Sequence, residues 1–142
     1  MVETAEGPVP IAETPGKGFP VLTRLPSGRL GFRQLLRVNA SGPVPLVRVV
    51  LTTGHSVLAA RGHLFYRAGM EPVPAEGLSA GDMLETAWHY PAGYAPGGAA
   101  PDAAGPAITV RAVEPAGEGA VFTGTVHETH ALFVTAGVLC GE

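Results

Sequence analysis

The chain has 142 residues, enough for one domain with a buried core that needs no disulfide or metal ion for stability. Nine Lys and Arg residues against 12 Asp and Glu residues give a formal net charge of −3. The sequence contains no cluster of basic residues, so its charge argues against nucleic acid or an anionic membrane as the main partner. The single cysteine, Cys140, excludes an intramolecular disulfide.

Composition also predicts the fold class. The 20 Gly and 14 Pro residues would break helices often, while the 46% of hydrophobic residues can fill short strands, so we expect an all-β fold with many turns. No run approaches the ~20 apolar residues of a membrane span, and the first residues lack the basic start and apolar core of an export signal. We therefore expect a cytoplasmic protein, and we expect it to be a monomer.

The first half of the chain alternates between apolar runs and turn residues. Residues 18–25 predict the first clear strand, and Pro26-Ser27-Gly28 predicts a turn after it. Residues 29–40 fit either a helix or a strand by spacing, and the turn signals on both sides favour a strand. A second turn is expected at residues 41–43, and a further strand at 44–52.

In the second half, prolines at positions 72 and 74 predict a loop within residues 67–80, followed by a tight turn that Asp82 would brace. Residues 91–106 are almost wholly Pro, Ala and Gly, which predicts a flexible surface loop. The remaining strands are expected at residues 107–113, 121–126 and 132–139.

Residues 52–66 carry the most suggestive side chains of the sequence. His55 and His63 lie eight residues apart, and each follows a glycine at which a strand could turn and expose an imidazole. The segment lies between two apolar runs, so it predicts paired strands with a polar residue at each bend. An imidazole titrates near neutral pH and suits proton transfer, although a hydrogen-bonded structural role is the commoner use of a histidine.

A metal site is an alternative that the sequence leaves open. His127 and His130 are three residues apart, and one upstream histidine could complete a zinc site. Residues three apart share a face of a helix but lie on opposite faces of a strand, so this pair could chelate a metal only from a turn. A zinc-binding β module is therefore the least favoured alternative.

Four segments, in this order, resemble the sequence blocks of one known family: Gly-Pro-Val-Pro-Ile-Ala-Glu at residues 7–13, and residues 49–58, 78–84 and 121–139. In the second segment Thr52 and His55 match a Thr-x-x-His motif, and in the fourth His130 falls on the family's histidine. The family is the Hint module, shared by inteins, bacterial intein-like domains and the C-terminal part of hedgehog proteins. The likeness covers nearly the full chain, and the order of the blocks is more specific than any single block.

This resemblance implies one domain over residues 1–142, folded as an all-β horseshoe of two pseudo-symmetric halves with its termini close together. It implies a self-processing module that cleaves or splices its own flanking peptide bonds without a cofactor. His55 would polarise the N-terminal bond and protonate its departing nitrogen, Thr52 would hydrogen-bond the same junction, and His130 would support the C-terminal step or the tetrahedral intermediate. The partners would be the flanking polypeptide segments.

The sequence departs from the family pattern at both ends. The family's opening thiol or hydroxyl residue has no match, because the matched block begins almost at Met1, and the family's closing His-Asn pair corresponds to Gly141-Glu142. We therefore expect the chain as written to be inactive, or to be a catalytically silent Hint-fold structural or binding module. Cys140 is a candidate acceptor thiol near the C-terminal junction, with a buried structural thiol as the alternative.

Overall fold

The computed structural model describes residues 1–4, 7–11, 19–86 and 108–141, and these are almost entirely antiparallel β-structure. The first sheet has the order β2-β1-β3-β4-β5, and β8 also pairs with β4. Its strands are β1 (Val2–Thr4), β2 (Gly7–Val9), β3 (Phe19–Arg24), β4 (Leu30–Leu51), β5 (Ser56–Ala60) and β8 (Val110–Val126). The second sheet has the order β7-β6-β10-β9. Its strands are β6 (Leu64–Arg67), β7 (Glu71–Pro74), β9 (Ala131–Phe133) and β10 (Leu139–Gly141). The predicted all-β class is confirmed.

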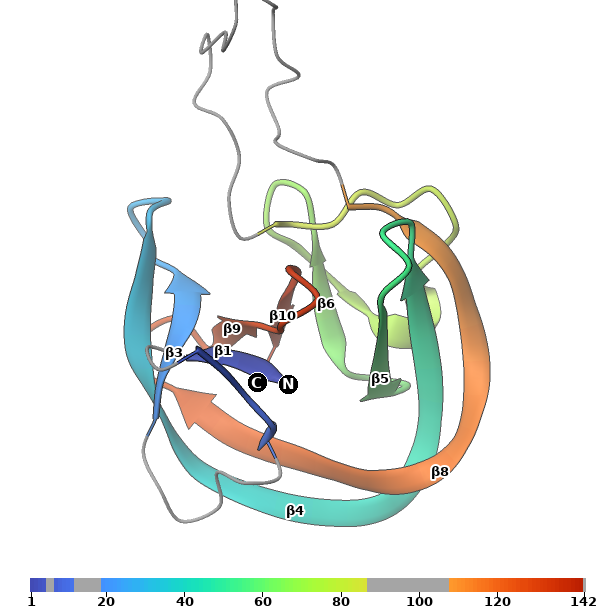
Figure 1. Ribbon diagram of the computed structural model, residues 1–142, viewed down its shortest axis with the longest axis horizontal. Coiled ribbons are helices and arrows are strands. Elements are labelled where there is room, and N and C mark those ends of the chain that lie inside the picture. The colour runs from blue at the N-terminus through green and yellow to red at the C-terminus, as the bar shows by residue number, and fades with distance from the viewer. Residues whose placement is uncertain (5–6, 12–18, 87–107, 142) are drawn as a thin grey trace, which may run out of the picture.

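Two long, curved strands, β4 with 22 residues and β8 with 17, form the outer arc of a horseshoe (Figure 1). The predicted turn at residues 41–43 is wrong, because β4 runs on through it and only its register with β8 shifts between Ser41 and Val44. Gly42 has a φ of 111° there, and a Cβ on it would lie 3.0 Å from the Gly119 carbonyl oxygen. Such a bulge bends a strand without reversing it.

Three smaller predictions have mixed outcomes. The loop predicted within residues 67–80 is wrong in part, because β7 pairs with β6 there; its two prolines are tolerated because β7 is an edge strand. The strand predicted at 132–139 is split into β9 and β10 by a turn in which the Gly137 N–H donates to the Val134 carbonyl (2.9 Å). Asp82 does brace its turn, because its Oδ2 accepts from the Ser79 N–H at 2.9 Å. The predicted loop at 91–106 lies outside the described residues.

The core lies where the small strands pack against the arc. Phe65 on β6 and Phe133 on β9 have no exposed surface, and Cys140 on β10 is packed into the same cluster as Phe65. A buried hydrogen bond ties the two sheets together, because the Thr23 hydroxyl on β3 donates to the Ala131 carbonyl on β9 at 2.7 Å. No helix within the described residues is both long and apolar enough to span a membrane.

We expect the substitution Phe133→Ala to lower the free energy of unfolding by about 3 to 5 kcal/mol, because it removes a fully buried ring and leaves a cavity between the sheets. The same substitution at Phe32, whose side chain is 46% exposed, should cost less than about 1 kcal/mol. Urea unfolding of both variants measures the difference. Equal losses would contradict the location of the core.

Candidate functional site

Both ends of the described chain lie inside the horseshoe (Figure 1). At the N-terminal end, the Met1 carbonyl accepts from the Thr135 N–H at 3.0 Å, and Val2 forms a β-bridge with Val134. At the C-terminal end, Gly141 pairs with Ala131 in the ladder between β10 and β9. The segment from β9 to β10 therefore holds both ends of the chain, and the expected closeness of the termini is observed.

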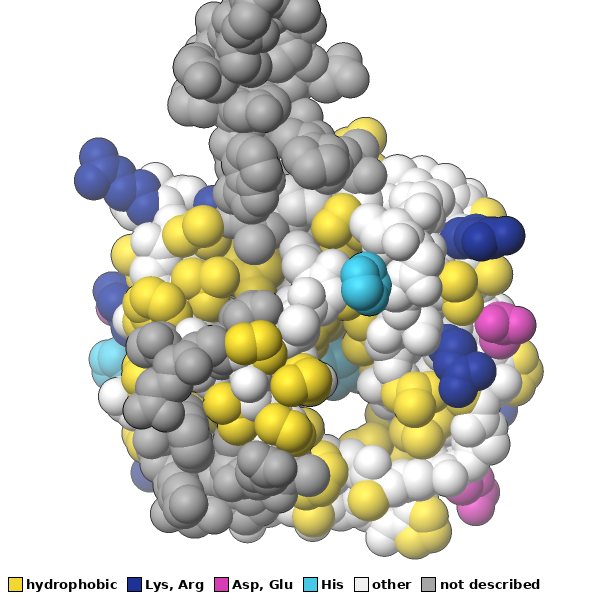
Figure 2. Space-filling model, viewed as in Figure 1, with side chains coloured by type: hydrophobic (Ala, Val, Ile, Leu, Met, Phe, Trp, Pro, Cys, Tyr) yellow, Lys and Arg dark blue, Asp and Glu magenta, His cyan; other side chains and the backbone are white. Residues whose placement is uncertain are grey.

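The two ends line a common cleft of about 830 Å³ in the middle of the horseshoe, here called the central cleft. Its other walls come from β4, β5, β8 and the β9–β10 segment, and they are mostly apolar. Five residues already singled out lie in its lining: Met1, His55, His63, Cys140 and Gly141. Figure 2 shows the hollow in this face of the molecule, with histidine side chains exposed in it.

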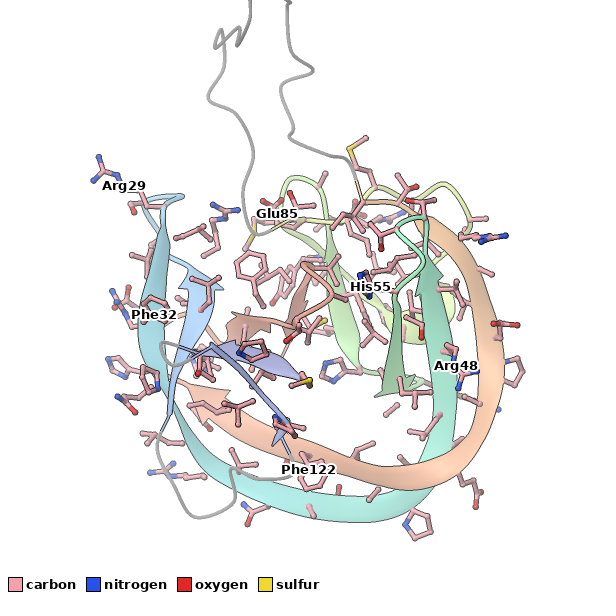
Figure 3. The ribbon with its side chains drawn as sticks, viewed as in Figure 1. Arg29, Phe32, Arg48, His55, Glu85 and Phe122 are labelled. Atoms are coloured by element: carbon pink, nitrogen blue, oxygen red, sulfur yellow. The ribbon has the colours of Figure 1, made fainter. Side chains whose placement is uncertain are left out.

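His55 is held by a compact loop between β4 and β5. Its carbonyl accepts from the Leu51 N–H at 2.8 Å, its own N–H donates to the Thr53 hydroxyl at 3.3 Å, and Gly54 takes a φ of 91° that lets the chain turn. The side chain is exposed and points toward the interior of the horseshoe (Figure 3). A fixed backbone with an accessible ring is what a proton donor to an incoming peptide needs.

Thr52 does not line the central cleft; its hydroxyl is hydrogen-bonded to Thr109 across the start of β8. It lies 3.3 Å from both the Thr109 carbonyl and the Thr109 N–H, and 3.2 Å from the Thr109 hydroxyl. The Thr52 N–H also donates to the Thr109 carbonyl at 3.0 Å. Thr52 therefore anchors the loop that carries His55. Thr109 is 57 residues away in the sequence, and no sequence pattern indicates the pairing.

His63 lies in the central cleft, just before β6. Its ring meets the Phe65 ring edge to face, with the centroids 6.0 Å apart, and it is hydrogen-bonded to the backbone of Gly141. Burial lowers the pKa of His63 below its ordinary value, and the bond to Gly141 offsets part of that effect. The ring is therefore neutral at neutral pH.

The structure places His130 immediately before β9. It ends the turn between β8 and β9, with a φ of 54°, and its N–H donates to the Val126 carbonyl at 3.1 Å. Its exposed side chain is not among the residues that line the central cleft. His127 lies at the start of the same turn and is also exposed. Across residues 1–4, 7–11, 19–86 and 108–141, no three His, Cys, Asp or Glu side chains gather closely enough to hold a metal ion.

Cys140 lines the cleft wall but is only 1% exposed. Burial strongly raises the pKa of its thiol, because a thiolate would lose its hydration there. A thiol acts as a nucleophile only as the thiolate, so this environment favours the buried structural alternative. Glu142, the other expected junction residue, lies outside the described residues.

Solved structures with the same architecture identify the fold. The chain aligns over its whole length with a bacterial intein-like domain from Clostridium thermocellum, covering 94% of that chain at 18% identity and a TM-score of 0.77. It aligns over 99% of its length with a Ssp DnaB mini-intein variant, covering 92% of that chain at 15% identity and a TM-score of 0.79. A DnaB intein from Synechocystis sp. PCC 6803 gives a TM-score of 0.75 at 16% identity, with 99% and 92% of the two chains covered.

No family model and no curated protein sequence matches the chain. At these identities the structural likeness defines the fold alone, and it is the Hint fold of inteins. The predicted horseshoe is confirmed.

We expect Cys140 in the folded protein to resist a disulfide reagent such as dithiobisnitrobenzoate, because the thiol is buried and un-ionised. Raising the pH from about 7 to 9 ionises an ordinary thiol of pKa about 8.5, but it should not speed the native reaction, since the pKa of Cys140 is raised. The same chain in denaturant should react at once. Rapid stoichiometric labelling of the folded protein would restore Cys140 as a candidate nucleophile.

Proposed function

We propose that this chain is a self-processing Hint module that is inactive as written and that, once its N-terminal junction carries a nucleophile, acts in cis, as a monomer, on peptide bonds in its own flanking segments. The observation that carries the proposal is that residues 1 and 141 line the same cleft as His55. A flanking segment joined at either end starts in the lining of this cleft, which His55 and His63 share, so the junction peptide bonds are confined to a space with two imidazoles. Such positioning replaces a bimolecular encounter with an intramolecular one, for which effective molarities of ~10⁵ M or more are known.

In the proposed N-terminal step, a thiol or hydroxyl of an opening residue attacks the preceding carbonyl and forms a thioester or ester. The C–N bond breaks, and the amide nitrogen becomes an amine that takes its proton from His55; the proton that the nucleophile loses returns to the ring. Thr52 has an indirect role in this step, because its hydrogen bonds to Thr109 hold the loop that positions the His55 ring. His130 lines no part of the cleft and contributes by forming the turn that begins β9, rather than by proton transfer.

The second candidate is a Hint-fold binding module without chemistry. Gly141-Glu142 favours it, because neither residue can perform the side-chain amide cyclisation that the family uses to release a downstream segment. The two candidates differ in one respect. A self-processing module cleaves a precursor that is given a nucleophile, whereas a binding module with the same fold leaves that precursor intact.

The test is a precursor with a peptide extension at each end and a Cys-containing opening segment placed before Val2. We expect an added thiol to release the N-terminal extension, and His55→Ala to slow that release at least about a hundredfold, the usual contribution of a general acid. His127→Ala is the matched control, because this exposed histidine lies outside the cleft lining, and it should cleave at the parental rate. Intact mass spectrometry over time measures both.

Two results would overturn the proposal. One is a precursor that stays intact whatever the position of the added cysteine near residue 1, with circular dichroism showing that it is folded. The other is undiminished cleavage in the His55→Ala precursor, which would remove the imidazole from the mechanism. Either result would leave the binding module as the better account.

A further inference from the structure

The C-terminal strand of the fold lies directly against the strand that follows His63. β10 and β6 are antiparallel, with Cys140 opposite Phe65, so the next residue, Gly141, comes opposite Leu64. A Cβ on Gly141 would lie 3.1 Å from the Leu64 Cβ, which confirms the close approach. The polypeptide therefore reaches its C-terminal end beside the residue that precedes β6, and that residue is His63.

Three interactions hold His63 in this position, two through its ring and one through its main chain. It packs edge to face on Phe65, its own main-chain carbonyl accepts from the Ala75 N–H at 2.8 Å, and it is hydrogen-bonded to the backbone of Gly141. The hydrogen bond to the Gly141 backbone raises the pKa of His63, so it stabilises the protonated ring. This is the effect of a ring N–H that donates to the Gly141 carbonyl. In the neutral imidazole, the second ring nitrogen keeps its lone pair and can accept a proton.

The two cleft histidines are separated by the whole of β5. His55 comes immediately before this five-residue strand, and His63 follows it after the turn at Arg61 and Gly62. At 3.3 Å per residue the four steps along this strand separate its first and last residues by about 13 Å. One imidazole therefore lies at each end of β5, and only His63 contacts the C-terminal strand.

We propose that His63 serves the C-terminal end of the cleft: it holds the Gly141 carbonyl and, once a side-chain amide stands at position 142 in place of Glu142, it accepts the proton which that amide loses on attacking the carbonyl of its own residue. Gly141 has no side chain of its own, and the imidazole reaches it from His63, just before β6. This assignment rests on the proposed self-processing function. It assigns His55 to the N-terminal junction and His63 to the C-terminal junction. Each histidine can therefore be substituted without slowing the reaction at the other junction.

The other ionisable groups of the described cleft lining are Arg48 on β4, His55, the α-amino group of Met1 and the buried Cys140 thiol. An extended precursor has no α-amino group at Met1, and the thiol stays neutral because burial raises its pKa. Arg61 and Glu76, near the turn before His63, are exposed. Within this described lining, His63 is therefore the group hydrogen-bonded to the C-terminal strand whose charge changes with pH, at a pKa lowered from its ordinary value.

The test uses the two-ended precursor with the substitution E142N. The introduced side-chain amide nitrogen attacks the main-chain carbonyl of its own residue and gives up a proton. The C–N bond to the downstream segment then breaks, and the departing nitrogen gains a proton and leaves as an amine. The products are a cyclic imide and a free amine, and no outside reagent is consumed. Release of the C-terminal extension is followed by intact mass, and thiol-induced release of the N-terminal extension is followed in the same samples.

We expect His63→Gln and His63→Phe to slow C-terminal release at least about a hundredfold, and to leave N-terminal release within about twofold of the parent. Glutamine keeps a donor for the Gly141 carbonyl but cannot take up a proton, and phenylalanine keeps the ring against Phe65 without either nitrogen. His55→Ala should slow N-terminal release and leave C-terminal release within about twofold of the parent. N-terminal release by each His63 variant also shows that its cleft is folded.

The pH profile separates proton transfer from a structural role. Protonated His63 cannot accept a proton, and its pKa is lowered, so parental C-terminal release should rise with pH through a midpoint below the ordinary 6.5 and then level off. The His63 variants should lose this midpoint. C-terminal release that is undiminished in both variants, or absent in a parent that cleaves at its N-terminal junction, overturns the assignment of His63. A parent that cleaves at neither junction overturns the proposed function, and this assignment with it.

Discussion

The pairing of β4 with β8 is the constraint on which the rest of the structure depends. β3 pairs with the start of β4, at Leu30 to Leu35, and β5 pairs with its end, at Leu46 to Val50, so one strand carries both sides of the horseshoe. The register shifts along the β4–β8 ladder bend this strand between those two regions. A straight strand of 22 residues would be about 70 Å long and could not bring its two ends around a common cleft.

The bend in β4 and β8 creates the central cleft. Because the arc faces inward, the short strands β1, β9 and β10 fill its centre, and their pairing with one another places both ends of the chain there. Burial of Phe65 and Phe133 holds these short strands in place, since ladders of one to three residue pairs alone are too weak to do so. The same apolar packing excludes water around the inner groups, which is why His63 and Cys140 have shifted pKa values.

Local sequence signals predicted local structure well and long-range pairing poorly. The turn at residues 26–28 and the brace at Asp82 depend on residues next to them, and both are present. Residues 41–43 contain Gly and Pro, which suit a turn or a bulge equally; the partner strand β8, some 75 residues later, decides between them. The Thr-x-x-His spacing located His55 in the cleft, but the partner of Thr52 lies 57 residues away. His130 fits its sequence block, yet its backbone conformation places it in a turn.

The environment of the C-terminal strand decides which of its groups can react. A Cys and a His that line one cleft, as Cys140 and His63 do here, suggest a thiolate–imidazolium pair, in which each charge stabilises the other. Here burial opposes both charges, because it raises the pKa of the Cys140 thiol and lowers the pKa of His63. Forming the pair would place two charges in the apolar wall of the cleft, and the neutral pair is the more stable state. The imidazole therefore keeps its lone pair, and the backbone carbonyl of Gly141, rather than the thiol, is the group it can act on.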